Sequence, residues 1–378
     1  SCSFSGCEYL TFQEVIMTAG LILTGTALND TLSGFAGGDI IYGLEGNDYL
    51  SGGAGDDVIW AGDGNDSLIG GVGSDVLYGG AGGDSLNGGA DNDFLYGDGG
   101  LDSLYGGAGN DVLDGGDDND YLSAGVGNDT LVGGLGVDSL YGGDGDDAMD
   151  GGDGADYLKA GLGNDVLYGG LGNDTIYGNE GENFIDGGEG NDVLYAGIGF
   201  NETVMGGAGN DTIYSESGTG YNGYGIVTVD GGAGNDRLVG SSVGLDVFLF
   251  NGDFGLDTVI GAANNPVGSV NDYLEFSVDH TQLWFTKSGS ALNISVIGTN
   301  NQVSIANWYT GSGGQADVGA STSTGFSFLG VANVDALVSA MSSLSPPPMG
   351  QTTLTQAYMD VLGVTLSSSW GGPGVGAS

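Results

Sequence analysis

Apolar and polar positions alternate along much of the chain in a pattern that repeats every nine residues. From residue 25 to residue 195 the chain divides into 19 consecutive nonapeptides without an insertion, of which residues 52–60, Gly-Gly-Ala-Gly-Asp-Asp-Val-Ile-Trp, are one example. Positions one to five are rich in glycine, and position eight is Leu, Ile or Met in every unit. Position six is Asp in 18 of the 19 units, with Asn183 as the exception. A period this strict predicts a repeat architecture.

Each half of the nonapeptide predicts its own local structure. Glycine at positions one to five allows positive φ angles and tight turns. Positions seven to nine are typical of a strand, in which position eight faces one side and positions seven and nine face the other. Position eight is therefore the predicted core. Two nonapeptides form one coil of 18 residues, so we expect an all-β fold, a parallel β-roll of two sheets with about nine coils over residues 25–195.

The regularity weakens after residue 195. Residues 206–214 and 231–239 are clean units, 252–260 is a looser one, and an insertion surrounds residues 215–224. Longer alternating runs then predict antiparallel hairpin strands that cap the stack, at residues 273–276, 282–285, 292–296 and 302–305. Short helices are expected at 331–341 and 354–362. We expect an N-terminal segment (1–24), a β-roll (25–260) that is irregular after residue 195, a β-rich cap (261–330) and a helical or flexible tail (331–378).

The net charge of the chain limits the classes of partner that it can bind. The chain carries 50 acidic and three basic residues, a formal net charge of -47. Nucleic acid and anionic membranes are excluded as partners, because both require basic patches. No run of 18 apolar residues is present, so no membrane span is expected. Because 39% of the residues are hydrophobic, a packed core is possible, and bound divalent cations would neutralise the acidic groups.

The acidic turns have the chemistry of calcium sites. Calcium binds six to eight oxygens and mixes carboxylates with backbone carbonyls, which glycine turns expose. Stacked turns 18 residues apart, such as those of Asp57 and Asp75, would share an ion. If every gap is filled, the 19 turns bind about 17 ions or more. The predicted ligands are Asp30, Asp39, Asp48, Asp57, Asp66, Asp75, Asp84, Asp93, Asp102, Asp111, Asp120, Asp129, Asp138, Asp147, Asp156, Asp165, Asp174, Asp192, Asp211 and Asp236.

These units resemble the RTX (repeats-in-toxin) nonapeptide, Gly-Gly-x-Gly-x-Asp-x-apolar-x. Residues 246–260, 283–309, 334–341 and 346–353 are similar to the end of the roll, the C-terminal cap and the tail of many RTX proteins. The resemblance implies export by a type I secretion apparatus that reads an uncleaved C-terminal signal. It also implies an extracellular protein whose roll is unfolded in low cytosolic calcium and folds outside the cell.

Catalysis is not expected. Only 24 residues precede the repeats, which is too few for a catalytic domain at that place. His280 is the only histidine, and a polar surface role suits it better than a metal-ligand role. Residues 240–244, Gly-Ser-Ser-Val-Gly, match the nucleophile elbow literally but lack its strand–turn–helix setting and a triad histidine. Cys2 and Cys7 could form a disulfide or remain two thiols, and the sequence leaves both open.

The outward positions of the even-numbered repeats are apolar and aromatic, whereas position seven of the odd-numbered repeats is mostly Ser, Thr and Tyr. We expect this apolar face to pack against a second copy, in a filament or cell-surface layer, or against the chain's own cap. Its predicted interface residues are Tyr42, Val58, Trp60, Val76, Tyr78, Phe94 and Tyr96. The main hypothesis is a secreted calcium-binding structural protein that self-assembles. The alternative is an adhesin or carbohydrate-binding module that uses the aromatic ladder.

Overall fold

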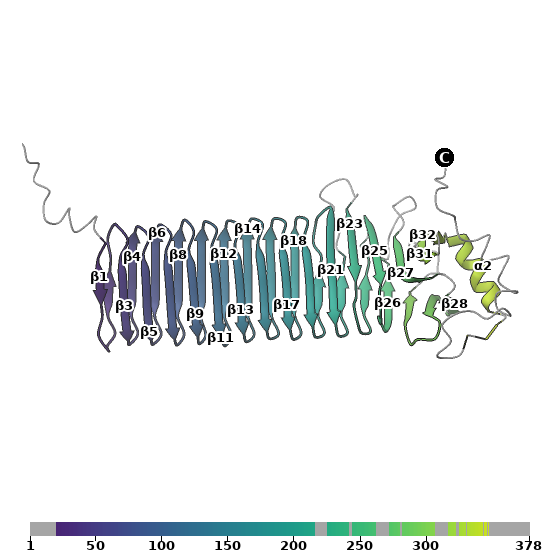
Figure 1. The fold of residues 1–378 in the computed structure, drawn as a ribbon, viewed down its shortest axis with the longest axis horizontal. Helices are drawn as coiled ribbons and strands as arrows, with labels where there is room; N and C mark the ends of the chain where they lie inside the picture. The colour runs from purple at the N-terminus through teal and green to yellow at the C-terminus, as the bar shows by residue number, and fades with distance from the viewer. Residues whose placement is uncertain are drawn as a thin grey trace, which may run out of the picture. The chain divides into compact units, whose positions relative to one another are not determined.

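The computed structural model describes residues 20–215, 225–241, 244–261, 272–279, 282–306, 317–322, 325–329, 331–342, 344–345 and 347, in two units, Ser1–Leu162 and Gly163–Ser378. Both units are parallel β-solenoids of two sheets, with about 13 coils in total (Figure 1). The odd-numbered strands form sheet A and the even-numbered strands are in sheet B through the repeat region. Strands are numbered from β1, which precedes the first repeat, so sheet A holds the even-numbered repeats and sheet B holds the odd-numbered repeats. The predicted fold class is confirmed.

In the first unit the two sheets take their strands alternately from the chain. Sheet A contains β1 (Ile22–Thr24), β3 (Ile40–Glu45), β5 (Val58–Asp63), β7 (Val76–Ala81), β9 (Phe94–Gly99), β11 (Val112–Asp117), β13 (Thr130–Leu135) and β15 (Ala148–Asp153). Sheet B contains β2 (Thr31–Ser33), β4 (Tyr49–Ala54), β6 (Ser67–Val72), β8 (Ser85–Ala90), β10 (Ser103–Ala108), β12 (Tyr121–Val126), β14 (Ser139–Asp144) and β16 (Tyr157–Leu162).

The second unit continues the same alternation and ends in antiparallel strands. Sheet A runs in the order β17 (Val166–Leu171), β19 (Phe184–Glu189), β21 (Asn201–Ala208), β23 (Ile226–Asp230), β25 (Leu245–Phe250), β27 (Tyr273–Asp279), β31 (Asp317–Thr322) and β32 (Gly325–Leu329). Sheet B runs in the order β18 (Thr175–Glu180), β20 (Val193–Tyr195), β22 (Thr212–Tyr214), β24 (Arg237–Val239), β26 (Leu256–Ile260), β30 (Gln302–Ile305), β29 (Ala291–Val296) and β28 (Leu283–Ser288).

The register of the sheets follows the 18-residue coil. Val58 pairs with Val76 and Ile59 pairs with Leu77, so equivalent positions of successive coils lie beside one another. Inward positions six, eight and one alternate with outward positions seven and nine. From Ile41 onward position eight is fully buried in a row of Leu, Ile and Met, as predicted, and Leu104 and Leu113 are both 0% exposed, whereas Leu32 in the first repeat is half-buried.

Glycines at positions two and four make the turns possible. Gly53 and Gly55, for example, have φ of +114° and +119°, in the left-handed region that side chains disfavour. A Cβ at these positions would also contact the backbone of the preceding coil. The exceptions, such as Leu44 with φ of +90°, are few. The glycine-rich half of the repeat is therefore required both by the turn and by the close stacking of coils.

Position five adds a row of hydrogen bonds along the turns. The Asn110 N–H donates to Asn92 Oδ1 at 2.7 Å, and the Asn128 N–H donates to Asn110 Oδ1 at 2.9 Å. The same contact joins Asn191 to Asn173 at 2.7 Å in the second unit. Each of these asparagine side chains at position five therefore accepts a bond from the coil that follows it in the chain.

The end of the second unit differs in part from the sequence prediction. Strands β28, β29 and β30 pair antiparallel, as do β31 and β32, as expected for hairpins. However, β27 pairs parallel with β25, and β30 pairs parallel with β26. The prediction that residues 273–276 form an antiparallel hairpin strand is therefore wrong. Residues 302–305 do form a hairpin strand, but they also pair parallel with the roll, which was not predicted. Both runs extend the solenoid, because their alternation also suits another coil.

One helix is described, α2 (Val331–Met341), at the residues where the sequence predicts it. Leu337 and Met341 are buried, and the Phe285 N–H of β28 donates to Met341 Sδ at 3.1 Å. The expected helix at 354–362 lies outside the described residues. Among the described residues, no helix has the length and apolar character needed to span a membrane.

Candidate calcium sites

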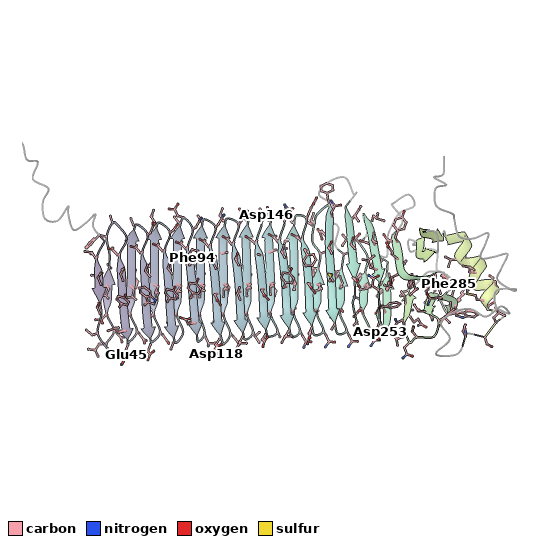
Figure 2. The ribbon with its side chains drawn as sticks, viewed as in Figure 1. Glu45, Phe94, Asp118, Asp146, Asp253 and Phe285 are labelled. Carbon is pink, nitrogen blue, oxygen red and sulfur yellow. The ribbon has the colours of Figure 1, made fainter. Side chains whose placement is uncertain are left out.

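The position-six aspartates form two columns, one at each edge of the roll. Figure 2 shows Glu45 and Asp118, from the turns of odd-numbered repeats, at one edge of the first unit, and Asp146, from an even-numbered repeat, at the opposite edge. Glu45 and Asp146 are exposed, whereas the position-six aspartates point inward and are almost fully buried. The alternation of the strand explains this difference, because position six shares the inward face with position eight.

Hydrogen bonds link each column from coil to coil. The Asp84 N–H donates to Asp102 Oδ1 at 2.7 Å, and the Asp102 N–H donates to Asp120 Oδ1 at 2.8 Å. The second unit repeats the contact between the Asp192 N–H and Asp211 Oδ1, at 2.8 Å. Each carboxylate therefore uses one oxygen to bind the turn of the preceding coil.

In most of the described column aspartates the other carboxylate oxygen, Oδ2, is buried and accepts no hydrogen bond. A buried anion without a partner is costly, and such groups are normally paired or bound to a metal. In the first unit these oxygens belong to Asp48, Asp57, Asp66, Asp75, Asp84, Asp93, Asp102, Asp111, Asp120, Asp129 and Asp138. In the second unit they belong to Asp192, Asp211, Asp236 and Asp257. Asp147, Asp156, Asp165 and Asp174 are also buried in the columns.

Glycine at position one lies against the unpartnered oxygen in most repeats, whereas Ala61 and Ala124 take this position beside Asp66 and Asp129. A Cβ at Gly97 would lie 2.5 Å from Asp102 Oδ2 and 2.5 Å from the carbonyl oxygen of Gly115, one coil later. The second unit repeats this arrangement, since a Cβ at Gly187 would lie 2.5 Å from Asp192 Oδ2. A side chain at these positions would collide with the carboxylate oxygen, and at Gly97 also with a carbonyl oxygen of the next coil, so both oxygens lie close to the same glycine.

Burial makes these carboxylates hold protons strongly when no cation compensates them. Burial raises the pKa of Asp84 to about 7, and the charges of Asp102 and Asp66 add to the rise, while a hydrogen bond from the Asp66 N–H opposes it. Burial is also the main cause elsewhere in the columns. It raises the pKa to about 7 at Asp75, Asp93, Asp120 and Asp211, to about 6 at Asp102, Asp129, Asp156 and Asp236, and to about 8 at Asp257.

This donor set fits calcium. Hard carboxylate and carbonyl oxygens are its preferred ligands, and a bound cation would supply the charge that the buried carboxylates lack. Among the described residues, no three His, Cys, Asp or Glu side chains gather closely enough to hold a metal by themselves. Backbone carbonyls of the turns would therefore complete each site. The number of ions stays a prediction.

In the first aspartate of each column, Oδ2 accepts a hydrogen bond from a backbone N–H. Asp30 Oδ2 accepts a hydrogen bond from the Thr26 N–H at 2.6 Å, and Asp39 Oδ2 accepts one from the Phe35 N–H at 2.9 Å. Both were predicted as calcium ligands, but in these two turns the backbone of the same repeat already binds the oxygen that is unpartnered in the later coils.

Sequence reasoning missed Asp257. It belongs to the loose unit 252–260, yet its Oδ1 accepts the Asp236 N–H at 2.9 Å and its Oδ2 is buried without a partner. Its place is visible in the sequence once Leu256–Ile260 is aligned as a strand. Asp246 was also missed as a member of the other column, where its Oδ2 accepts the N–H of Ser241 at 2.7 Å.

The predicted interface residues lie on the outer face of sheet A in the first unit. Trp60 is 37% exposed and Phe94 is 42% exposed, while the remaining five are half-buried: Tyr42, Val58, Val76, Tyr78 and Tyr96. The rings of Tyr42, Trp60, Tyr78 and Tyr96 stack in one row, with successive centroids 5.0, 5.6 and 4.9 Å apart and planes within 9° of parallel.

Sheet B of the first unit also carries an aromatic row, which the sequence analysis did not identify. Tyr105, Tyr121, Tyr141 and Tyr157 contact one another with centroids 5.3–5.8 Å apart and planes tilted by 37–46°. The row zigzags because its members alternate between positions nine and seven of successive odd-numbered repeats. The two faces therefore differ less than position seven alone indicates.

The residues weighed for catalysis or for a disulfide are mostly outside the described residues: His280, Ser242, Cys2 and Cys7. Ser241 is described, and its N–H and hydroxyl bind the Asp246 carboxylate.

The comparisons agree with the site. The family model of the RTX calcium-binding nonapeptide repeat matches residues 22–219 through overlapping segments, and also residues 223–242. These segments cover more than half of the chain and contain all of the predicted ligands. No curated protein matches the chain. The matched repeats and the two columns of buried aspartates together indicate calcium binding by a β-solenoid. The chain therefore belongs to the RTX calcium-binding nonapeptide repeat family.

Proposed function

We propose that this chain is a secreted, non-enzymatic structural protein that folds when it meets extracellular calcium and then self-assembles. The observation that supports the proposal best is the row of buried aspartate oxygens without hydrogen-bond donors. A solenoid with so many buried carboxylates needs cations to be stable at neutral pH. Sites of the extracellular type bind calcium at about 0.1–1 mM, so the free energy of binding becomes free energy of folding.

Far-UV circular dichroism tests the folding step. In 5 mM calcium we expect the β-sheet signal, and in excess EGTA at pH 7.5 we expect the spectrum of an unfolded chain. Magnesium at the same concentration controls for ionic strength, because it dehydrates reluctantly and demands a more rigid octahedral site. An equal β signal in EGTA and in calcium contradicts the proposal.

Self-association is proposed through the outer face of sheet A, where Ile40, Val58, Val76 and Phe94 lie beside the stacked aromatic row. Calcium would make this contact possible by neutralising two copies that otherwise repel each other. We expect Tyr42→Ser with Trp60→Ser to shift the protein toward monomer in calcium, as measured by sedimentation velocity and electron microscopy. Tyr105→Ser with Tyr141→Ser on sheet B is the matched control. If the two double variants assemble alike, this face is not the interface.

Glycan binding is the weaker alternative. Aromatic residues bind sugars with a free ring face, but the inner rings of the row, Trp60 and Tyr78, are each stacked on both sides at 4.9–5.6 Å. Mainly ring edges are left to face outward. Binding to a glycan array without polymerisation would favour this alternative over self-assembly.

Export by a type I apparatus is proposed from the likeness of the C-terminal region to RTX tails. Deletion of residues 331–378 is expected to retain the protein in cells that carry such an apparatus, while transfer of these residues to a reporter should export it. Export of the truncated chain at the normal level contradicts this part of the proposal.

A further inference from the structure

One column of the second unit changes its chemistry where the other column continues. Asp192, Asp211, Asp236 and Asp257 maintain the column of the odd-numbered repeats. In the other column, by contrast, strand pairing places Asn183, Glu202 and Val227 at successive position-six sites. Neither the nonapeptide rule nor the predicted ligand set assigns a metal ligand to these three positions.

Asn183 interrupts the column because it presents a donor where the others present an anion. Its Oδ1 accepts the Asp165 N–H at 2.9 Å, as an aspartate would. Its Nδ2 is therefore the buried atom without a hydrogen bond, in the place of the unpartnered Oδ2. An amide N–H repels a cation, so the column of even-numbered repeats loses its carboxylate at this coil.

Glu202 restores a carboxylate one coil later, in a different form. Its side chain is 1% exposed, and both Oε1 and Oε2 are buried without a hydrogen bond. In the aspartate columns only one oxygen of each carboxylate is unpartnered. Burial raises the pKa of Glu202 to about 8, with no basic group among the causes.

Backbone oxygen lies beside this carboxylate. A Cβ at Gly199 would lie 2.7 Å from Glu202 Oε1 and would also contact the Gly181 carbonyl oxygen of the preceding coil. A side chain at position 199 would collide with both oxygens, so the Glu202 carboxylate and the Gly181 carbonyl oxygen lie close to the same glycine. Ligands of this type suit calcium, and a carboxylate with two available oxygens can bind it in a bidentate manner.

We propose that Glu202, with the Gly181 carbonyl, forms a separate calcium site that is built on one bidentate carboxylate. The proposal rests on the calcium-binding function proposed above. Because its neighbours in the column are Asn183 and Val227, the site has one negative charge where the ladder sites have adjacent aspartates. Its affinity is therefore lower than theirs, since charge count sets calcium affinity.

Native mass spectrometry of the full chain, titrated with calcium, tests the proposal. Glu202→Gln keeps the shape of the side chain and is expected to bind one ion fewer at saturation, with the weakest binding step lost. Glu202→Asp keeps the charge and should retain the ion with altered affinity. Glu189→Gln, at an exposed position of β19, is the matched control and should bind the full number.

Anomalous diffraction from crystals grown in calcium gives an independent result that does not depend on a variant folding. A peak beside Glu202 and the Gly181 carbonyl is expected in the wild-type protein. An ion count that is unchanged in Glu202→Gln, or a map with ions beside Asp211 and none beside Glu202, overturns the proposal and leaves a buried protonated carboxyl. If the wild-type protein binds no calcium at all, the proposed function itself fails.

Discussion

The replacement Asp102→Asn separates the role of the cation from that of the hydrogen-bond ladder. Asp102 Oδ1 accepts the Asp84 N–H at 2.7 Å, and an amide oxygen can accept it too, as Asn183 does from Asp165 at 2.9 Å. The variant therefore keeps the contact between coils and loses the buried charge. Its side chain then places an N–H₂ group in the space beside Gly97, where calcium is expected.

The size of the effect follows from the number of ions lost. Asp102 stands between Asp84 and Asp120 and borders two gaps of its column. When calcium is at about 100 times its dissociation constant, each bound ion contributes about 2.7 kcal/mol to stability. Losing one or both neighbouring ions therefore costs about 3–5 kcal/mol in calcium. Without calcium the sign reverses above pH 6, because the wild-type protein must bury a carboxylate whose pKa is raised to about 6 by burial.

Hydrogen exchange of the coils around residues 84–120 is the suitable assay, because the stability of repeat proteins is largely local and need not be two-state. It is measured in 10 mM calcium and in metal-free buffer at pH 7.5. Asp63→Asn, at an exposed position of β5, removes the same charge without touching the column and is the control. If Asp102→Asn destabilises these coils equally with and without calcium, or no more than the control does, the assignment of the column to calcium is refuted.

Further predictions concern the apo state, the core and the position-five row. Metal-free protein should lose β structure as pH rises from 4 to 8. Burial raises the folded-state pKa of aspartates such as Asp75 to about 7, so the folded state holds more protons than the unfolded state in this pH range. Circular dichroism measured against pH checks this prediction, and a signal that does not change with pH contradicts it. Leu113→Ala should lower the free energy of unfolding by about 2–5 kcal/mol, as measured by urea unfolding. Leu135→Ala, at a half-exposed position, should change it by no more than about 0.5 kcal/mol. Asn110→Ala should cost up to about 1 kcal/mol by thermal melting, equally with and without calcium, because the bond that it removes, from the Asn128 N–H to Asn110 Oδ1, involves no ion. A calcium-dependent loss would link the row to the metal.

Most of the solenoid could be predicted from the sequence because its signals are local and repeated. Glycine at position four, as at Gly55, sets the turn, and an apolar residue at position eight, as at Leu104, sets the core. The end of the roll was harder to predict. Residues 273–276 alternate in the same way whether the strand pairs parallel or antiparallel, and only the pairing of β27 with β25 decides between them.

The candidate site was predictable in its ligand type but not in its details. The spacing of aspartates indicates calcium, yet it does not show that Asp39 is already bound by the Phe35 N–H, because this bond depends on the local shape of the folded turn. Nor does it distinguish Glu202 from the many surface carboxylates, since the insertion after residue 215 and the irregular unit 197–205 hide its column position. The burial of that carboxylate emerges only when the coils are stacked.

The two rows of turn bonds point in opposite directions, which gives the polypeptide an order of assembly. A position-six N–H donates forward, as from Asp84 to Asp102, while a position-five N–H donates backward, as from Asn110 to Asn92. During synthesis each position-six donor is therefore made about eighteen residues before its acceptor. The most recently formed coil always has one position-six N–H group that lacks its acceptor. In one column Asp272 Oδ1 fills this role, because it accepts the Asp246 N–H at 3.2 Å. A chain shortened before Asp272 would leave this N–H without its acceptor, and another molecule could supply one.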